Sequence, residues 1–300
     1  MADAARGGWG RRFVIGVPYL WLTLFFLVPF ILVLKISFSE PIMAQPPYGP
    51  LWQTDANGQT ELKANVDNFA FLVDDPFYKD AYFKAVKTAF FSTLMALLIG
   101  YPMAYGIARA SPTWRNAMLM LVVLPFWTSF LIRVYSWKVL LQGTGPVNGL
   151  LMYFGLIDEP IQILYTDFAI YLGIVYSYLP FMILPLYANL EKHDNTLLEA
   201  AADLGAGPVT AFFRITLPQS VAGIIAGSLL VFIPAVGEYV VPSLLGRTDQ
   251  LMIGRVLSDE FFENRDWPMA SSVAILVLLV LVIPIMLFQH FQRRELEAKK

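Results

Sequence analysis

The sequence predicts an all-α, polytopic membrane protein with six transmembrane helices. Hydrophobic residues make up 57% of its 300 residues and charged residues only 15%, whereas a typical soluble domain carries about 25% charged residues. The mean hydropathy is +0.58. The apolar residues also gather into runs of about 20 residues, the length that an α-helix needs to cross the hydrocarbon core. A bundle of membrane-spanning helices explains both the apolar composition and the length of the apolar runs.

Each predicted span is an apolar run with interior Gly or Pro, or with an aromatic boundary, as membrane helices tolerate. The first run follows Arg11 and Arg12 and is too long for the apolar part of a signal peptide, so we expect it to remain as an uncleaved span. The third and fifth runs are the least regular. The predicted spans cover residues 13–37, 84–108, 116–141, 168–190, 219–245 and 270–291.

The basic residues predict which side of the membrane each loop occupies. With the N-terminus inside, the inner segments carry most of the Lys and Arg residues, as the positive-inside rule requires. Both termini are then cytoplasmic. Residues 38–83 form the first outer loop, and 146–160 are predicted to form a short helix near the outer interface. Because no linker or soluble domain is evident, residues 1–300 are expected to be a single transmembrane domain.

The inner loop at 191–218 has a clear local pattern. Thr196 and Glu199 have the spacing of a capping box, which predicts a short helix over 197–204. Gly205 ends that helix by allowing positive φ. We therefore expect a rigid helical hairpin on the inner face instead of a flexible linker.

The second half of this loop continues the pattern. Gly207 also allows positive φ, and Pro208 suits the first turn of a second helix. Several apolar side chains are expected to be exposed on the loop, which is typical of a docking surface. They are Leu197, Leu198, Ala201, Phe212 and Phe213.

One ordered motif lies in the same loop. Glu-Ala-Ala at 199–201 is followed after three residues by Gly205, and after nine more by Ile-Thr-Leu-Pro at 215–218. This resembles the cytoplasmic signature of ABC importer permeases, which that family places before its penultimate span. The resemblance implies the type I ABC importer permease fold, and a coupling helix that docks on a separate ATPase subunit. It assigns this role to Glu199, Ala200, Ala201, Asp203 and Gly205.

Three further stretches, 97–109, 124–141 and 237–246, are similar to the polyamine branch of that family. The resemblance implies the first of two permeases in a putrescine or spermidine importer of the bacterial cytoplasmic (inner) membrane. It also implies three partners: a second permease, an ATPase dimer on the cytoplasmic face and an external substrate-binding protein. Branches for other small organic ions or ferric iron share the architecture and remain alternatives.

The sequence favours a transport subunit over an enzyme. It has no G-x-x-x-x-G-K-[ST] motif, so ATP and Mg²⁺ are expected on the partner ATPase, and no cofactor is expected on this chain. It has no cysteines, and neither His193 nor His290 has metal-ligand spacing around it. No nucleophile–base pair is evident, so no catalytic residues are assigned. The net charge of −2 gives no sign of a nucleic-acid partner.

Glu238 stands well inside the fifth predicted span. An ionisable residue at that depth usually faces a wet path or the protein interior, and its carboxylate would attract a polyamine. Aromatic rings nearby could face an ammonium group. The alternative is a structural ion pair with Arg133, which falls at a similar depth, and the sequence leaves both open. The substrate-path candidates are Glu238, Tyr239, Trp127, Arg133, Tyr135 and Trp137.

Gly223 and Gly227 form a GxxxG step, which predicts close helix packing in the bundle.

Three other classes of protein are alternatives to an importer permease. A secondary transporter would normally show paired broken helices in two repeated halves, and a membrane enzyme would show clustered His, Asp or Glu. A passive scaffold is the third. Co-purification of an ATPase would separate these from an importer permease.

Overall fold

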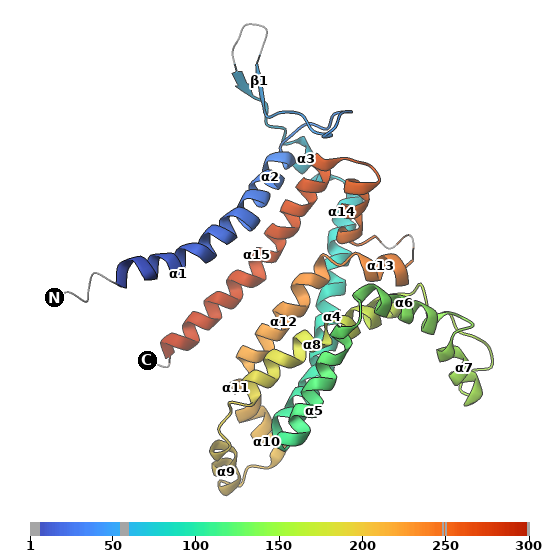
Figure 1. Cartoon of the computed structure of the whole chain (residues 1–300). Helices are drawn as coiled ribbons and strands as arrows, with labels where there is room; N and C mark the ends of the chain where they lie inside the picture. The colour runs from blue at the N-terminus through green and yellow to red at the C-terminus, as the bar shows by residue number, and fades with distance from the viewer. Residues whose placement is uncertain (1–6, 55–59, 248, 250, 299–300) are drawn as a thin grey trace, which may run out of the picture. The chain divides into compact units, whose positions relative to one another are not determined.

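The structure is a computed structural model that describes residues 7–54, 60–247, 249 and 251–298, and these residues are mostly helical (Figure 1). The chain divides into two compact units: Met1–Pro76 with Leu257–Leu278, and Phe77–Val256 with Leu279–Lys300. Four described helices are long and apolar enough to span a membrane, or up to six if each of two bent helix pairs forms one span. The prediction of an all-α protein with several membrane spans is confirmed, since strands are confined to one short hairpin among the described residues.

The first unit contains an N-terminal span and an outer segment. The candidate span Phe13–Ser37 has the bounds that the sequence predicts. The Asn68 side chain donates hydrogen bonds to the carbonyl oxygens of Ser37 and Ser39, at 3.3 and 3.2 Å. These bonds satisfy carbonyl groups at the C-terminal end of that span. Residues 55–59 of the predicted outer loop lie outside the described residues. The elements are α1 (Gly7–Leu22), a π-helical turn (Thr23–Leu27), α2 (Val28–Ser37), antiparallel β1 (Trp52–Thr54) and β2 (Thr60–Leu62), and α3 (Asp67–Asp74).

The second unit contains the central helices. Its elements are α4 (Pro76–Arg109), α5 (Pro112–Val123), a 3-10 turn (Leu124–Trp127), α6 (Phe130–Leu141), α7 (Pro146–Tyr153), α8 (Asp167–Leu190), α9 (Thr196–Asp203), α10 (Pro208–Ala211), a π-helical turn (Phe212–Thr216), α11 (Leu217–Gln219), α12 (Val221–Val236) and α13 (Val240–Leu245). The helices α14 (Ile253–Phe262) and α15 (Trp267–Ala298) each contribute residues to both units. The short helix predicted within 146–160 is confirmed as α7.

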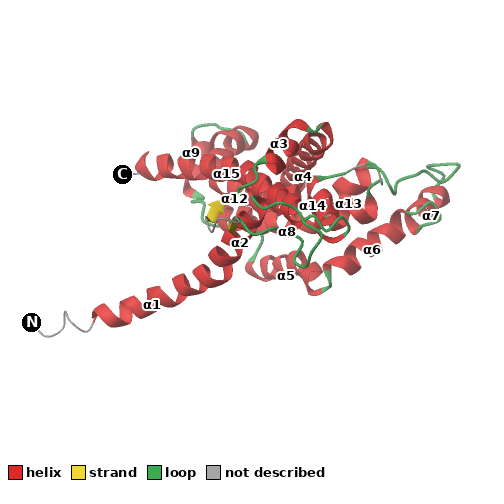
Figure 2. Ribbon diagram, turned by 90° about the horizontal axis from the view of Figure 1, so that it is seen from above, coloured by secondary structure: helices red, strands yellow, loops and turns green. Residues whose placement is uncertain are grey.

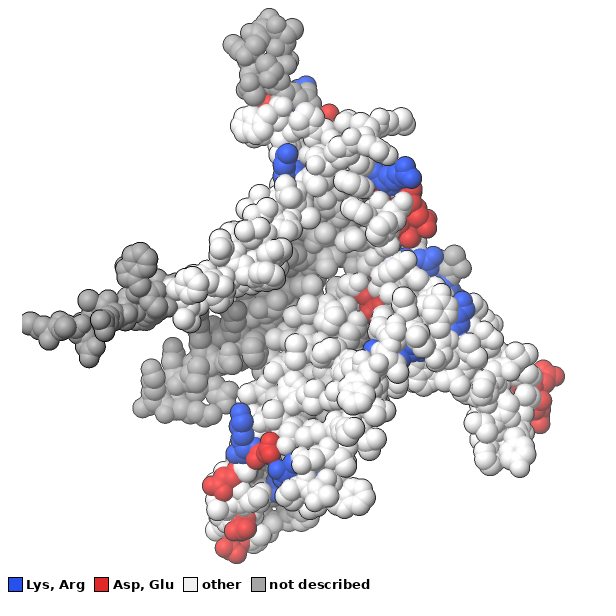
Figure 3. Space-filling model, viewed as in Figure 1, with Lys and Arg blue, Asp and Glu red and all other residues white. Residues whose placement is uncertain are grey.

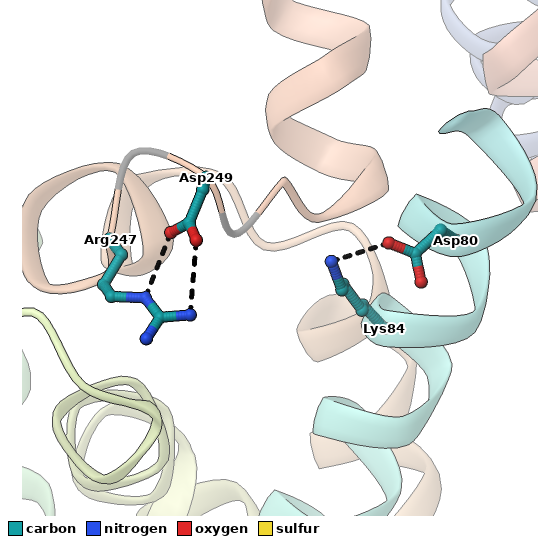
Figure 4. A network of polar contacts seen from close by, with 4 residues as sticks. All are labelled: Asp80, Lys84, Arg247 and Asp249. Carbon is teal, nitrogen blue, oxygen red and sulfur yellow. Dashed lines mark hydrogen bonds and ion pairs between the residues drawn. The ribbon is translucent and has the colours of Figure 1, made fainter. Parts of the chain in front are cut away.

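The second span begins earlier than the sequence predicts. α4 starts at Pro76 instead of 84. Lys84 Nζ lies 2.6 Å from Asp80 Oδ2, an (i, i+4) pair that stabilises the added turns by a few tenths of a kcal/mol, roughly (Figure 4). Figure 4 also shows a second ion pair of this unit, Arg247 with Asp249, whose atoms lie 3.0 Å apart.

The predicted third span, 116–141, is wrong as one continuous helix. The two arms of the bent pair Pro112–Trp127 and Phe130–Tyr153 meet at 91°. The break follows Pro125, which has no N–H to donate and disfavours helical backbone at the residue before it. Thr128 and Ser129 between the arms have ψ angles of 152° and 138°, outside the helical region.

The predicted fifth span, 219–245, is also broken. α12 ends at Val236 and α13 begins at Val240, so Gly237, Glu238 and Tyr239 form the connection. Two backbone segments approach each other closely here, because a Cβ atom added to Gly254 would overlap the carbonyl oxygen of Gly237. A side chain at position 254 would therefore displace this connection.

The packing predicted for the GxxxG step is confirmed. α12 lies along α8, and an added Cβ at Gly223 would lie 2.8 Å from the Asn189 Cβ. At Gly227 it would lie 2.8 Å from Met182 Sδ and 3.0 Å from the Met182 carbonyl oxygen, so backbone approaches backbone. The absence of side chains at these positions sets the distance between the two helices.

We expect Gly227→Ala to destabilise the assembled protein by about 1–3 kcal/mol, because Met182 is fully buried and its backbone cannot move aside. The measurement is the thermal unfolding midpoint of the purified protein in detergent. Gly106→Ala is the matched control, because an added Cβ there meets nothing within 4 Å. Equal midpoints for the two variants would contradict this account of the α8–α12 contact.

Candidate functional site

The helix α9 forms where the sequence predicts it, but a different side chain binds its first backbone N–H. The backbone N–H of Thr196 donates to Asp194 Oδ1 at 2.9 Å, and Thr196 itself is already helical. The predicted capping box between Thr196 and Glu199 is therefore wrong. An Asp side chain readily accepts from the backbone two residues ahead, which gives the turn at this helix start. Hydrogen bonds from Thr196 hold the pKa of Asp194 below its usual value.

The end of α9 is fixed by glycine as predicted. Gly205 has a φ of +79°. Its N–H donates to the Ala202 carbonyl at 2.8 Å, and the Ala206 N–H donates to the Ala201 carbonyl at 2.9 Å, which together form a Schellman motif. Gly207 has a φ of −70°, so its predicted positive φ is wrong. It instead precedes Pro208, which opens α10 as predicted.

The exposed residues of this loop differ in part from the prediction. Glu199, Ala200, Asp203 and Gly205 are exposed, but Ala201 is buried at 7% exposure. Phe212, the first residue of the π-helical turn after α10, is also half-buried, because it packs edge-on against Tyr101 and Tyr105 of α4 with ring centroids 5.7 and 6.0 Å apart. Leu197 and Phe213 are exposed as predicted. Two further exposed apolar side chains were not predicted: Leu204, with 88% of its surface exposed, and Val209, with 68%.

Two arginines hold the base of the loop against neighbouring helices. Arg109 Nη1 donates to Asn195 Oδ1 at 3.0 Å, and Arg115 Nη1 lies 2.8 Å from Glu191 Oε1. Figure 3 shows charged side chains gathered at the α9 end of this unit, while much of the visible surface between that end and α13 is uncharged. The loop is therefore a rigid projection fixed to the end of the bundle, with an exposed apolar tip.

We expect Asp194→Ala to speed amide hydrogen exchange in α9 at pH 7, while Asp194→Asn, which keeps an acceptor oxygen, restores most of the protection. Because the folded pKa of Asp194 is lowered, its contribution is present above its unfolded pKa and is lost as the pH falls through the folded pKa. The protection of the α9 amides from exchange, corrected for the intrinsic rate, should thus become equal in the wild type and in Asp194→Ala at acid pH. A constant difference at every pH would contradict this role.

Glu238 is buried within this unit, at 5% exposure, and its carboxylate has three donors. Its Oε1 accepts from the N–H groups of Val240 and Val241, at 3.0 and 3.2 Å, and its Oε2 accepts from the Tyr178 hydroxyl. The carboxylate therefore caps the start of α13 and ties that helix to α8. Tyr178 was missed by the sequence analysis, since it lies 60 residues away in the chain.

The alternative of an ion pair between Arg133 and Glu238 is not what the structure shows. The Arg133 guanidinium carbon lies 5.4 Å from the Phe126 ring centroid and 5.7 Å from that of Phe130. Its Nε and Nη1 atoms are buried without a hydrogen-bond partner. The two aromatic faces supply part of the stabilisation that a carboxylate would otherwise give.

The remaining candidates lie on two packed elements. α6 packs against α13, and Figures 1 and 2 both show them side by side. Tyr135 and Trp137 belong to α6, and the Glu238–Tyr239 connection directly precedes α13. Tyr135, Tyr239 and Trp127 are exposed in this chain, whereas Trp137 packs edge-on against Tyr176 with centroids 5.2 Å apart.

The apolar helices, two pairs of which form bent spans, define a multi-span membrane protein. Residues 96–297 match the family described as "Binding-protein-dependent transport system inner membrane component", and the chain belongs to this family. It is thus a multi-pass inner-membrane transport subunit and not an enzyme, as predicted. The matched segment contains both the α9 loop and Glu238.

Relatives match nearly the whole chain. The "Spermidine/putrescine transport system permease protein PotB" of Haemophilus influenzae is 38% identical over 97% of this chain and 96% of its own length. The protein of the same name from Escherichia coli K12 is 38% identical, with coverage of 93% and 96%. A bacterial ABC transporter involved in alginate import has a chain of the same fold, with a TM-score of 0.67, 19% identity and coverage of 97% and 99%.

Proposed function

We propose that this chain is the permease subunit of an ATP-driven importer for polyamines, putrescine or spermidine. The observation that carries the proposal is the 38% identity, over nearly the full length, to permeases named for spermidine and putrescine transport. The buried Glu238 carboxylate supports it, because a polycation gains from a negative charge placed in the membrane.

The α9 loop is proposed to dock on a separate ATPase, two copies of which bind ATP and Mg²⁺ at the cytoplasmic face. Four of the five predicted docking residues, Glu199, Ala200, Asp203 and Gly205, are exposed and available to a partner. Buried Ala201 instead seats α9 on its own unit. The exposed side chains of Leu204 and Val209 extend the apolar tip that would enter a groove of the ATPase.

Because the α9 loop is rigid, it can couple movement of the ATPase to movement of the membrane helices. The arginine contacts at the base of the loop transmit a movement of the ATPase to the ends of α4 and α5. ATP binding and hydrolysis on the partner would move these helices as a body and change which side of the membrane the path faces. A second permease completes the path, an external binding protein delivers the substrate, and both termini lie in the cytoplasm.

The substrate path is proposed to run past the broken fifth span. Glu238 supplies the charge, while Tyr239, Tyr135 and Trp127 supply exposed aromatic faces for ammonium groups. Trp137 supports α6 through its contact with Tyr176. Arg133, which is held by two Phe rings, places a positive charge on α6 that limits how many cations the path holds at once.

Competition for uptake tests the substrate. In vesicles that contain the whole complex, we expect unlabelled spermidine and putrescine to suppress uptake of labelled putrescine, and ferric iron to have no effect. Suppression by ferric iron, with none by either polyamine, would assign the chain to a different branch of the family.

A further inference from the structure

The first turn of α14 lies against the connection between α12 and α13, within the second unit. A Cβ atom added to Gly254 would overlap the carbonyl oxygen of Gly237, and it would lie 2.8 Å from the carbonyl oxygen of Glu238. Both obstacles are backbone atoms, so no side-chain rotation relieves the overlap. Glycine is the residue that allows two backbone segments to approach this closely.

Each side of this contact is held in place. In α14, Ile253 and Val256 flank Gly254 and are buried, with 0% and 3% of their surface exposed. On the other side, Val241 and Leu245 of α13 are fully buried. A side chain at position 254 can therefore be accommodated only if the first turn of α14 or the α12–α13 connection moves.

The helix α13 is in turn fixed against α8. A Cβ atom added to Gly173 of α8 would lie 2.7 Å from Val241 Cγ1 and 2.8 Å from Leu245 Cδ1. The Glu238 carboxylate caps the same helix α13, and it accepts a hydrogen bond from Tyr178 of α8. The side chain of Glu238 is thus held by α8 and α13, whereas its backbone is held by α14.

The position of this carboxylate decides how well it can receive a cation. The attraction between a carboxylate and an ammonium group falls with distance, and their hydrogen bond weakens steeply when it is bent. Relief of the overlap at position 254 needs a shift on the order of 1 Å, and a misplacement of that size can cost roughly 100-fold in the rate of a step that depends on position.

We propose that Gly254 is a positioning residue for the substrate. Because it lets α14 approach the α12–α13 connection, it sets where the Glu238 carboxylate stands when it receives an ammonium group. This inference rests on the proposed function. It adds to the predicted substrate path a residue of α14 that acts through Glu238.

Hydrogen exchange and uptake by the assembled transporter together test this role. Gly254→Ala should speed exchange of the Val240 and Val241 amides, whose N–H groups donate to Glu238 Oε1. It should also reduce uptake of labelled putrescine by about tenfold or more. The matched control is Gly149→Ala, because position 149 is also helical but an added Cβ there meets nothing within 4 Å. The control should change neither quantity.

A double-mutant cycle with Glu238→Gln distinguishes positioning from a purely structural role. If Gly254 acts through the carboxylate, adding Gly254→Ala to Glu238→Gln should lower uptake by less than about twofold further. If the losses of the two single variants multiply instead, Gly254 has only a structural role and the proposal is overturned. Unchanged exchange at Val240 and Val241 in Gly254→Ala overturns it as well.

Ile253→Ala keeps the test decisive if Gly254→Ala does not assemble. Deletion of this buried side chain loosens the first turn of α14 instead of overfilling the contact. It should likewise speed exchange at Val240 and Val241, and unchanged exchange would overturn the proposal. Normal uptake by Glu238→Gln alone would contradict the proposed role of Glu238. Loss of uptake by Glu238→Gln, with none by Gly254→Ala, would contradict only this inference.

Discussion

Glu238→Gln should reduce polyamine uptake at least tenfold while the transporter remains assembled. The Gln side chain keeps an acceptor oxygen for the N–H groups of Val240 and Val241, so the start of α13 stays capped. It removes the negative charge, whose attraction for an ammonium group about 4 Å away is roughly 4 kcal/mol at an effective dielectric constant of about 20. Because Glu238 forms no ion pair among the described residues, that attraction remains available to the substrate. The measurement is initial uptake of labelled putrescine by reconstituted vesicles.

Tyr178→Phe distinguishes the effect of the Glu238 charge from the effect of its hydrogen bond to α8. It deletes the hydroxyl that donates to Glu238 Oε2 but leaves the carboxylate charged. If charge attracts the substrate, Tyr178→Phe retains most of the uptake that Glu238→Gln loses. Normal uptake by Glu238→Gln would remove Glu238 from the path and leave it only the role of capping α13.

The second large effect is expected from Gly205→Val. An added Cβ at Gly205 meets nothing within 4 Å, so the substitution acts through the backbone alone. A β-branched residue at the observed φ of +79° costs about 1–3 kcal/mol, and relief of that strain unwinds the end of α9. Loss of the Schellman bonds would displace Leu204, the most exposed apolar side chain of the loop. We expect ATP-dependent uptake to fall about tenfold or more.

Gly207→Val is the matched control for Gly205→Val. Gly207 lies two residues away, an added Cβ there also meets nothing within 4 Å, and its φ of −70° suits any residue. ATPase activity without substrate-coupled uptake should appear only in Gly205→Val. Equal uptake by the two variants would show that the shape of the α9 end does not matter for coupling.

The parts of the fold that follow from local pattern could be predicted from sequence. Apolar run length located the first span, and Gly205 and Pro208 located the end of α9 and the start of α10. The breaks after Pro125 and Val236 were not resolved, because a Pro or Gly in a membrane helix is compatible with both a kink and an intact span. The side chain at the start of α9 was misassigned because Asp194 and Thr196 are both good acceptors near a helix start.

The partners of the buried groups could not be predicted, because they depend on which helices meet. Depth along the membrane suggested Arg133 for Glu238, but depth does not fix the rotation of a helix about its axis. In the structure Tyr178 of α8 faces Glu238, and Arg133 faces two rings of its own segment. The same limit applies to Phe212, whose burial depends on Tyr101 and Tyr105 of α4.

The central claim is that the α9 loop seats a separate ATPase, and site-directed disulfide crosslinking tests it most directly. The chain has no cysteines, so a single introduced thiol has no background within it. We predict that Ala200→Cys in the assembled transporter crosslinks to single-cysteine ATPase subunits, while Gly149→Cys on α7 does not. An assembly that hydrolyses no ATP, or one whose ATPase crosslinks at α7 and never at α9, would contradict the account.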